Sequence, residues 1–183
     1  MAMTAKALLM RINEMKRVAM AEYASNPYVT IHDYSRSESA EKRNPYSLWI
    51  DLNYPVYVLK DGKPVLQQGI KDVCILFKTT YPDERPTIKF PVSVASIHMW
   101  NNNYACTHTV YNPQTHNLTK EIANIMTLAA NCPEGINYLS PTSDHKWLID
   151  WTKESLRSGV LPTVPYQKLF MVHRSTRRNM RRI

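Results

Sequence analysis

The chain has 183 residues, the length of one domain with room for a short tail. Apolar residues make up 44% of it, enough to build a hydrophobic core, so a wholly disordered chain is excluded. The formal net charge is +8, but much of it lies in the last eleven residues, which contain five arginines and no acid: Arg174, Arg177, Arg178, Arg181 and Arg182. The body is therefore nearly balanced in charge. The basic end is predicted to be a solvated tail, with phosphate binding or docking on an acidic partner as its alternatives.

The apolar segments are all short. The longest wholly apolar runs have about half a dozen residues, far fewer than the ~20 that a membrane-spanning helix needs. The first ten residues lack the apolar core of a signal peptide, and the three cysteines form neither a disulfide framework nor a paired metal motif. We therefore expect a cytoplasmic protein with no membrane partner, no cofactor and no metal.

The first half of the chain is predicted to form one helix and a sheet. An amphipathic pattern over residues 4–24 indicates a helix with Thr4 as its N-cap, and Asn26-Pro27 follows it. A strong turn signal stands at Asp61-Gly62. Strand patterns cover 28–33, 46–52, 54–59, 73–77 and 87–90, with a bend or hairpin between the second and third. This order predicts a four-strand antiparallel meander.

The second half begins with a long irregular stretch at 91–118, and such stretches are usually functional or disordered. A helix is then predicted over 119–131, with Thr119 as its N-cap. A further helix is predicted over 143–158, capped by Ser143 or Asp144. Its expected buried side consists of Trp147, Leu148, Trp151 and Leu156. The fold class is α+β, with a domain at 1–165 and a basic tail at 166–183.

The three cysteines differ in their surroundings. Cys74 lies in an apolar run and is predicted to be a buried core residue, and Cys132 follows a helix and is predicted to be structural. Cys106 lies in the irregular stretch, eight residues after His98 and two residues before His108. A nearby imidazolium or backbone amide lowers the pKa of a thiol and so favours the nucleophilic thiolate. Cys106 is therefore the candidate nucleophile.

Three consecutive asparagines precede this cysteine, namely Asn101, Asn102 and Asn103. Asparagine tolerates left-handed turn conformations, and its amide can donate hydrogen bonds to a developing oxyanion. Two further interpretations of the region are a zinc site and a Cys–His hydrolase. The zinc site would use Cys106, His98, His108 and His116, whose spacing fits no common ligand pattern, and no hydrolase signature is present.

The order of elements and several residues resemble the ubiquitin-conjugating enzymes. Residues 81–90 read Tyr-Pro-x-x-x-Pro-x-Ile-x-Phe and resemble the turn and strand motif of that family. His98 stands where the resemblance places the histidine of the family's His-Pro-Asn tripeptide, before the catalytic cysteine at Cys106. Leu118-Thr119 follows Cys106 as the family's Leu-Thr does at the start of its central helix. The resemblance covers residues 4–158 and implies the same fold.

The resemblance also implies roles for individual residues. Cys106 would carry a protein C-terminus as a thioester, and His98 would orient the loop rather than act as a base. The tripeptide reads His98-Met99-Trp100, so its asparagine is missing and one of Asn101 to Asn103 is expected to replace it. Asp144 is a candidate for the acid that helps deprotonate an incoming amine. Independently of the resemblance, His108 is a candidate for tuning the thiol, because residues two apart in an extended segment share a face.

The departures from the family pattern resemble free-standing bacterial members found in antiphage defence operons. There the resemblance implies that the thiol accepts the C-terminus of a cGAS-like nucleotidyltransferase. One alternative is conjugation of a bacterial ubiquitin-like protein, which would need an activating enzyme as a partner. A catalytically inactive binding module of the same fold is a second alternative, and a nucleic-acid binder that uses the arginine-rich tail is a third.

Overall fold

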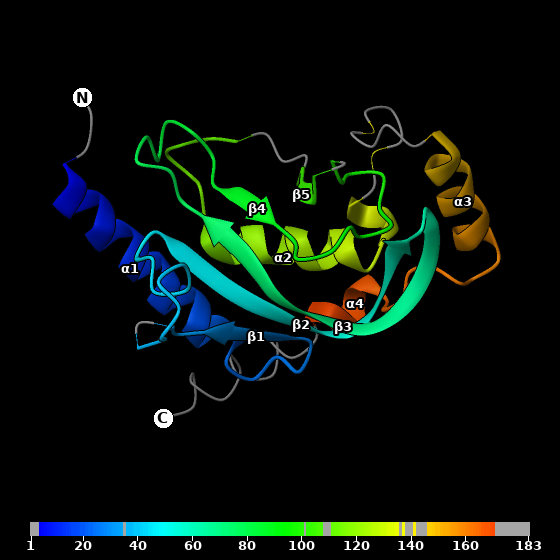
Figure 1. The fold of residues 1–183 in the computed structure, drawn as a ribbon, viewed down its shortest axis with the longest axis horizontal. Coiled ribbons are helices and arrows are strands. Elements are labelled where there is room, and N and C mark those ends of the chain that lie inside the picture. Colours follow the sequence, from blue (N-terminus) through cyan, green and yellow to red (C-terminus); the bar gives the residue numbers. More distant parts are fainter. Residues whose placement is uncertain are drawn as a thin grey trace, which may run out of the picture.

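The computed structural model describes residues 4–34, 36–100, 102–107, 111–135, 137, 141 and 146–170. Its helices lie around one antiparallel sheet (Figure 1). The elements in chain order are α1 (Ala5–Tyr23), β1 (Val29–His32), β2 (Ser47–Lys60), β3 (Lys63–Leu76), β4 (Thr87–Lys89), β5 (Tyr104–Ala105), α2 (Leu118–Ala129), the 3-10 helix η1 (Pro133–Gly135), α3 (Lys146–Arg157) and α4 (Tyr166–Phe170). Among these described residues, no helix is long and apolar enough to cross a membrane.

The sheet has the strand order β1-β2-β3-β4-β5, and each strand is antiparallel to its neighbours. The predicted segments 46–52 and 54–59 are one strand, β2, whose pairing with β3 shifts register between Ile50 and Pro55. The prediction of four strands was wrong, because β5 pairs with β4 within the stretch that was expected to be irregular. A two-residue strand has too few residues to show a period, so its sequence alone gives no strand signal.

Strand β3 begins well before the predicted apolar segment at 73–77. Its first half carries polar residues such as Gln67 and Gln68, which pair with Val56 and Pro55 of β2. The turn between the two strands was predicted correctly, since Asp61 has φ 50° and Gly62 has φ 71°. Positive φ at both central residues suits the right-handed twist of a two-residue hairpin. The turn chemistry, not the hydrophobic pattern, therefore determines where β3 starts.

Gly69 lies at the irregularity in the β2–β3 ladder. Its φ is +85°, and a Cβ added there would lie 2.6 Å from the backbone oxygen of Leu52. The oxygen belongs to the main chain of the paired strand, so it cannot move aside without breaking the ladder. Gly69 thus allows a bulge in the ladder, and β2 and β3 remain paired on either side of it.

We expect Gly69→Ala to lower the free energy of unfolding by about 2–3 kcal/mol, since it adds a backbone clash to a left-handed conformation. Gly62→Ala is the matched control, because that glycine also has positive φ but nothing lies within 4 Å of an added Cβ. It should cost only about 1 kcal/mol. Urea denaturation at pH 7 measures both values, and equal losses for the two variants would contradict the clash at Gly69.

Helix α1 confirms the predicted N-cap, with Thr4 Oγ1 accepting from the Ala7 amide at 3.3 Å. The predicted cap of α2 was wrong. Asn117, in extended conformation, is the N-cap, and its Oδ1 accepts from the Thr119 amide at 2.8 Å. Asparagine and threonine are both good N-caps, so the residue type alone did not determine which of the two positions begins the helix.

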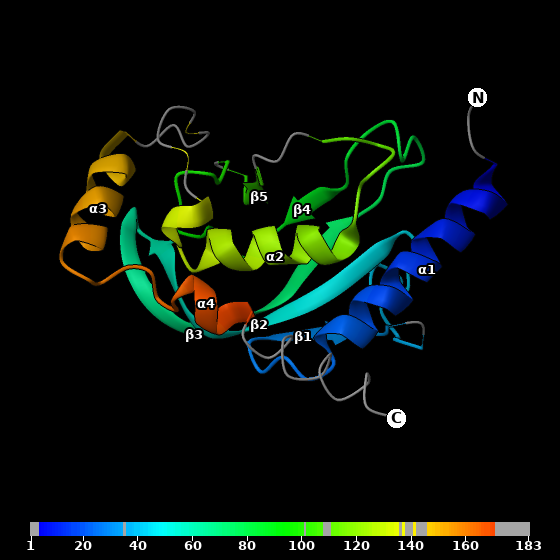
Figure 2. The same cartoon turned by 180° about the vertical axis from the view of Figure 1, so that it is seen from behind.

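Helix α2 runs across one face of the sheet, with α1 at one end and α3 at the other (Figures 1 and 2). Two tyrosine hydroxyls tie it to its neighbours. Tyr54 of β2 donates to the Met126 carbonyl at 2.8 Å, and Tyr23 of α1 donates to the Thr119 carbonyl at 3.0 Å. Residues Ile122, Ile125, Met126 and Ala129 are completely buried, as the helical pattern predicted. This central helix also forms one wall of the candidate site.

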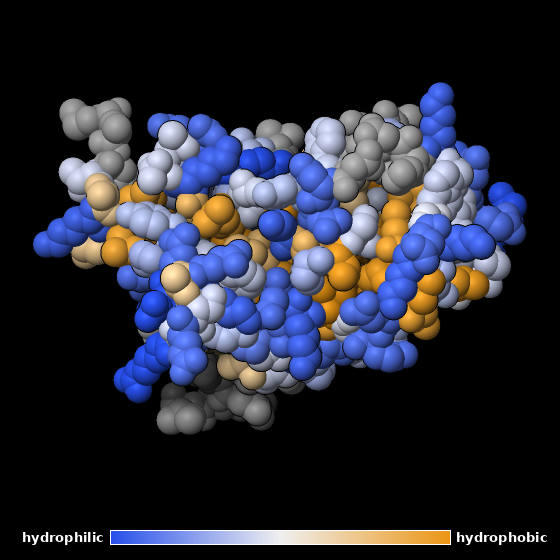
Figure 3. All heavy atoms as spheres, in the orientation of Figure 1, coloured by the Kyte–Doolittle hydropathy of each residue, from blue (hydrophilic) through white to orange (hydrophobic). Residues whose placement is uncertain are grey.

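Helix α3 packs mainly through Leu148, which is buried, and Trp151, whose ring lies 5.4 Å from that of Tyr57. Trp147 was expected on the buried side but is 39% exposed. The cluster that the helix joins is small and consists of Ala95, Ile97 and Leu148, with Tyr57, Leu59, Ile149 and Trp151 packed against it. Figure 3 shows a largely hydrophilic surface with apolar patches on its left, in its centre and on its right. The predicted caps Ser143 and Asp144 lie outside the described residues.

The folded domain extends past the predicted boundary at 165. Leu169 of α4 is completely buried in the main core, and its carbonyl accepts from the Asn26 side-chain amide at 2.9 Å. Residues 166–170 therefore pack as part of the domain, not as a tail. The five arginines of the basic end lie beyond the described residues.

Candidate active site around Cys106

Cys106 lies in a short hairpin at the edge of the sheet, directly after β5, which pairs with β4. The Cys106 amide donates to the His98 carbonyl at 2.9 Å, and the Trp100 amide donates to the Tyr104 carbonyl at 2.8 Å. Met99 and Ala105 form the bridge between these bonds and pack on the core side. His98 therefore lies directly across from Cys106, a proximity that their spacing in the sequence suggested but did not require.

The His98 side chain is buried, with 1% of the residue exposed. Its Nε2 accepts a hydrogen bond from the Asn137 amide at 2.9 Å. That nitrogen must be unprotonated to accept, and its lone pair is already used. The ring joins the hairpin to the segment after η1, and this geometry fits an orienting residue better than a general base.

The described asparagines form the turn of the hairpin. Asn103 has φ 66°, and its amide donates to the Trp100 carbonyl at 3.0 Å. The prediction that an asparagine adopts a left-handed conformation here is confirmed. Asn102 is exposed, and its side chain accepts from the Tyr104 amide at 3.4 Å.

The turn stands at the opposite end of the hairpin from the thiol. Three residues of extended chain, up to about 10 Å, separate Asn103 from Cys106. The structure thus brings His98 close to Cys106 and places Asn102 and Asn103 at the other end of the hairpin, away from the thiol. Asn101 and His108 lie outside the described residues.

The half-buried Cys106 lines a pocket of about 120 Å³. One wall is formed by α2, and the others come from η1 and α4. The lining residues besides Cys106 are Thr107, Ala123, Asn124, Thr127, Leu128, Glu134, Gly135 and Tyr166. Sequence reasoning did not connect α2, η1 and α4 with the cysteine, because only the tertiary fold brings them to it.

The other two cysteines are poor nucleophiles. Burial raises the pKa of the Cys74 thiol to about 11 and that of the Cys132 thiol to about 12. Cys132 is fully buried, and its thiol donates to the Val164 carbonyl at 3.3 Å. Both thiols therefore remain protonated at neutral pH. Cys132 is buried as a structural residue, as predicted, whereas the prediction of a buried core position for Cys74 was wrong, because that side chain in β3 is only half-buried.

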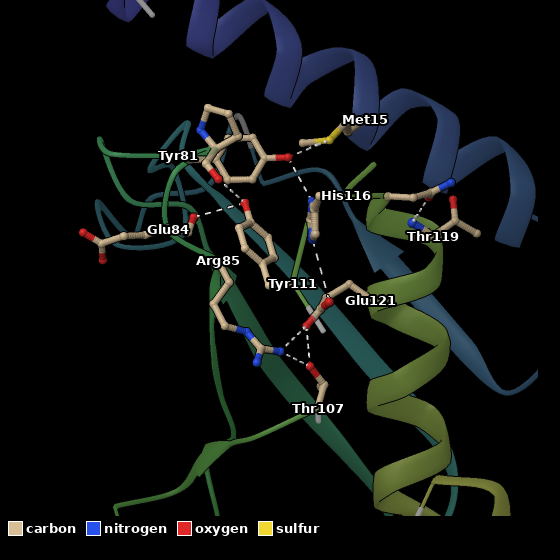
Figure 4. Close-up of polar contacts among 11 residues, drawn as sticks. Met15, Tyr81, Glu84, Arg85, Thr107, Tyr111, His116, Thr119 and Glu121 are labelled. Carbon is tan, nitrogen blue, oxygen red and sulfur yellow. Dashed lines mark hydrogen bonds and ion pairs between the residues drawn. The ribbon is translucent and has the colours of Figure 1, made fainter. Parts of the chain in front are cut away.

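A largely buried polar cluster surrounds Thr107, the residue after Cys106 (Figure 4). We call it the Glu121 cluster; its members are Arg85, Thr107, His116 and Glu121. Thr107 Oγ1 donates to Glu121 Oε1 at 2.9 Å, and Arg85 donates to the same Thr107 oxygen. Arg85 Nη2 and His116 Nε2 lie 3.6 and 3.7 Å from the Glu121 carboxylate. The cluster therefore joins the residue after Cys106 to the first turn of α2.

Burial tends to raise the pKa of Glu121, but the nearby His116 ring, the hydrogen bond from Thr107 and the charge of Arg85 outweigh it, so the net shift is downward. The carboxylate is thus charged at neutral pH although its side chain is only 5% exposed. The sequence suggested a role for His116 only in the zinc alternative and gave no reason to single out Glu121. The four residues of the cluster come from different segments, and their spacing in the sequence does not indicate that they meet.

Among the described residues, no group of three histidine, cysteine or acidic side chains could hold a metal ion. In the zinc alternative, His116 belongs to the Glu121 cluster and His98 binds the Asn137 amide. His108 lies outside the described residues. The described part of the proposed ligand set is therefore divided between two separate hydrogen-bonding networks.

No protein-family model matches the sequence, and no curated protein matches it. Among solved structures, the chain is similar to human ubiquitin-conjugating enzyme E2 G1, with a TM-score of 0.43 and 16% sequence identity. The alignment covers 66% of this chain and 96% of that chain. A similarity at this level identifies neither a family nor an activity for this protein.

Proposed function

We propose that the chain is a ubiquitin-conjugating-like acyl transferase that accepts a protein C-terminus as a thioester on Cys106. The observation that carries the proposal is the placement of this thiol. It is half-buried, it lines a pocket, and its backbone is bonded to that of a buried histidine. The family motif at 81–90 and the order of helix, meander and central helix give further support.

The chemistry proceeds in two acyl transfers. The Cys106 thiolate attacks the carbonyl carbon of an activated C-terminus, a tetrahedral intermediate forms, and the leaving group departs to give the Cys106 thioester. An amine then attacks the same carbonyl carbon, loses a proton and releases the thiol as an amide forms. Without such an amine the thioester persists as a long-lived adduct.

Side-chain and backbone amides near the thiol would stabilise the oxyanion in both steps. Asn101, Asn102 and Asn103 were the expected donors, and Asn124 is an additional one because it lines the same pocket as Cys106. His98 would hold the hairpin in place, and His108 would tune the thiol. The two main-chain bonds of the hairpin hold the backbone of His98 and Cys106 in place, as such roles require.

The proposed acyl donor is the C-terminus of a cGAS-like nucleotidyltransferase in bacterial antiphage defence, acting in the cytoplasm. A bacterial ubiquitin-like protein with its activating enzyme is the other donor. Both donors present a flexible C-terminal peptide, so the pocket chemistry is the same for the two. A binding module of the same fold would have no need for a thiol in the pocket.

The test uses synthetic thioesters, which need no activating enzyme. The protein is mixed with mercaptoethanesulfonate thioesters of a bacterial ubiquitin-like protein and of a C-terminal peptide from a cGAS-like nucleotidyltransferase. Non-reducing gels and intact mass should show an adduct that is lost in dithiothreitol. An adduct with one donor only would choose between the two donors. No adduct with either would overturn the proposal in favour of the binding module.

We propose that Glu134 accepts a proton from the attacking amine in the second transfer, since it lines the pocket with Cys106. A lysine amine is protonated at neutral pH and attacks only after losing its proton. Glu134→Gln should therefore slow discharge of the thioester to free lysine by about 10-fold or more, while thioester formation is unchanged. Single-turnover discharge, followed by non-reducing gels, measures the rate.

Glu154→Gln is the control, because that exposed glutamate pairs with Arg157 on α3. It should discharge at the wild-type rate. If Glu134→Gln also discharges at that rate, the assignment is wrong and Asp144 becomes the acid to replace next.

A further inference from the structure

Thr107, the residue directly after Cys106, is buried and tied to α2. Its hydroxyl donates to Glu121 Oε1 at 2.9 Å and accepts from the Arg85 guanidinium. In Figure 4 the Glu121 side chain extends from α2 toward Thr107 and Arg85, which come from other segments. The position after the cysteine is thus fixed by a hydrogen bond to a charged group, which is stronger than one between neutral groups.

Glu121 is itself held from several sides. Arg85 and His116 approach its two oxygens, and His116 Nδ1 shares a hydrogen bond of 2.9 Å with the Tyr81 hydroxyl. Tyr81 is buried and reaches Met15 of α1. A buried carboxylate is costly unless it is fully satisfied, so this arrangement holds the oxygen that Thr107 meets in one place.

The same helix also forms the pocket wall. Glu121, Asn124 and Leu128 follow at spacings of three and four, so they lie along one face of α2. Asn124 and Leu128 line the pocket beside Cys106, whereas Glu121 bonds to Thr107. A contact from Thr107 to this face therefore sets the distance between the thiol and the wall opposite it.

We propose that Glu121 is a positioning residue, which acts through Thr107 to hold Cys106 against the pocket wall formed by α2. The cysteine is then fixed on both sides, by the His98 carbonyl at its own amide and by the Glu121 cluster at the next residue. The consequence for acyl transfer depends on the proposed function. The consequence for the accessibility of the thiol does not.

The test replaces the hydroxyl while keeping the shape of the side chain. Thr107→Val removes the bond to Glu121, and Thr107→Ser restores it. Iodoacetamide labelling of each cysteine, followed by mass spectrometry of its peptide, reports accessibility. In Thr107→Val we expect Cys106 to be labelled about threefold faster, because the segment is released, and thioester formation to fall about 10- to 100-fold, because geometry is lost. Thr107→Ser should return both rates to within about twofold of wild type.

Two controls separate positioning from unfolding. Thr152→Val removes another buried threonine hydroxyl, which donates to the Leu148 carbonyl in α3, and should leave Cys106 labelling unchanged. Cys132 is fully buried and should stay unlabelled in every variant unless the domain opens. Faster labelling of Cys106 and Cys132 together would overturn the proposal, as would Cys106 labelling within twofold of wild type in Thr107→Val. If the wild type forms no thioester, the proposed function fails while the labelling rates still decide the positioning role.

Discussion

Cys106→Ser should abolish the dithiothreitol-sensitive adduct, and Cys106→Ala should form no adduct at all. The thiol is the nucleophile of the proposed reaction, and a hydroxyl is a much weaker one because so little of it is ionised at neutral pH. We expect adduct formation to fall by more than about 100-fold in the serine variant. Any product it does form would be an oxyester, which resists dithiothreitol but is cleaved by hydroxylamine.

Cys74→Ser is the matched control for this experiment. Cys74 is another half-buried thiol, in β3, and burial raises its pKa to about 11. Its replacement should leave the rate of adduct formation unchanged. A reducible adduct that persists in Cys106→Ala would show that another thiol reacts, and the proposed site would then be wrong.

Glu121→Ala should lower the free energy of unfolding by about 3–5 kcal/mol. Removing the carboxylate leaves Arg85, Thr107 and His116 without the acceptor that they share in a largely buried site. Glu121→Gln keeps the shape and one acceptor oxygen, so it should cost less, about 1–3 kcal/mol. Glu154→Ala, which removes an exposed helix pair with Arg157, should change the value by less than about 1 kcal/mol. Urea denaturation of the three variants measures these differences.

The same carboxylate makes stability depend on pH. The pKa of Glu121 is lower in the folded protein than the ordinary value of 4.5, so the folded state binds the proton more weakly than the unfolded state. Its contribution is therefore fully present above pH 4.5 and is lost as pH falls through the lower, folded pKa. The advantage of wild type over Glu121→Gln should shrink across that acid range. A difference that stays constant from pH 7 down to the acid limit of folding would contradict a charged Glu121.

The sequence predicted the elements whose signals are local. The amphipathic pattern of α1 and the cap at Thr4 were confirmed, as was the turn at Asp61-Gly62. The left-handed asparagine was confirmed at Asn103. Each of these depends on backbone geometry or periodicity within a few residues, which tertiary contacts rarely overrule.

Other features depended on contacts between distant segments. Strand β5 has two residues and exists because β4 pairs with it. Trp147 has the right helical position to be buried but is 39% exposed. Local sequence signals could not have shown where a neighbouring element ends.

The composition and spacing of the sequence by themselves determined three things: an α+β domain with helices outside the sheet, a near-neutral body apart from its arginine-rich end, and Cys106 as the thiol to examine. Tertiary structure alone decided what surrounds that thiol. Glu134 and Tyr166 reach the pocket from segments 28 and 60 residues beyond Cys106, and Glu121 meets Arg85 and Thr107 across three segments. The physical reason is that pKa values, burial and accessibility depend on neighbours in space, and a chain specifies those neighbours only once its core has packed.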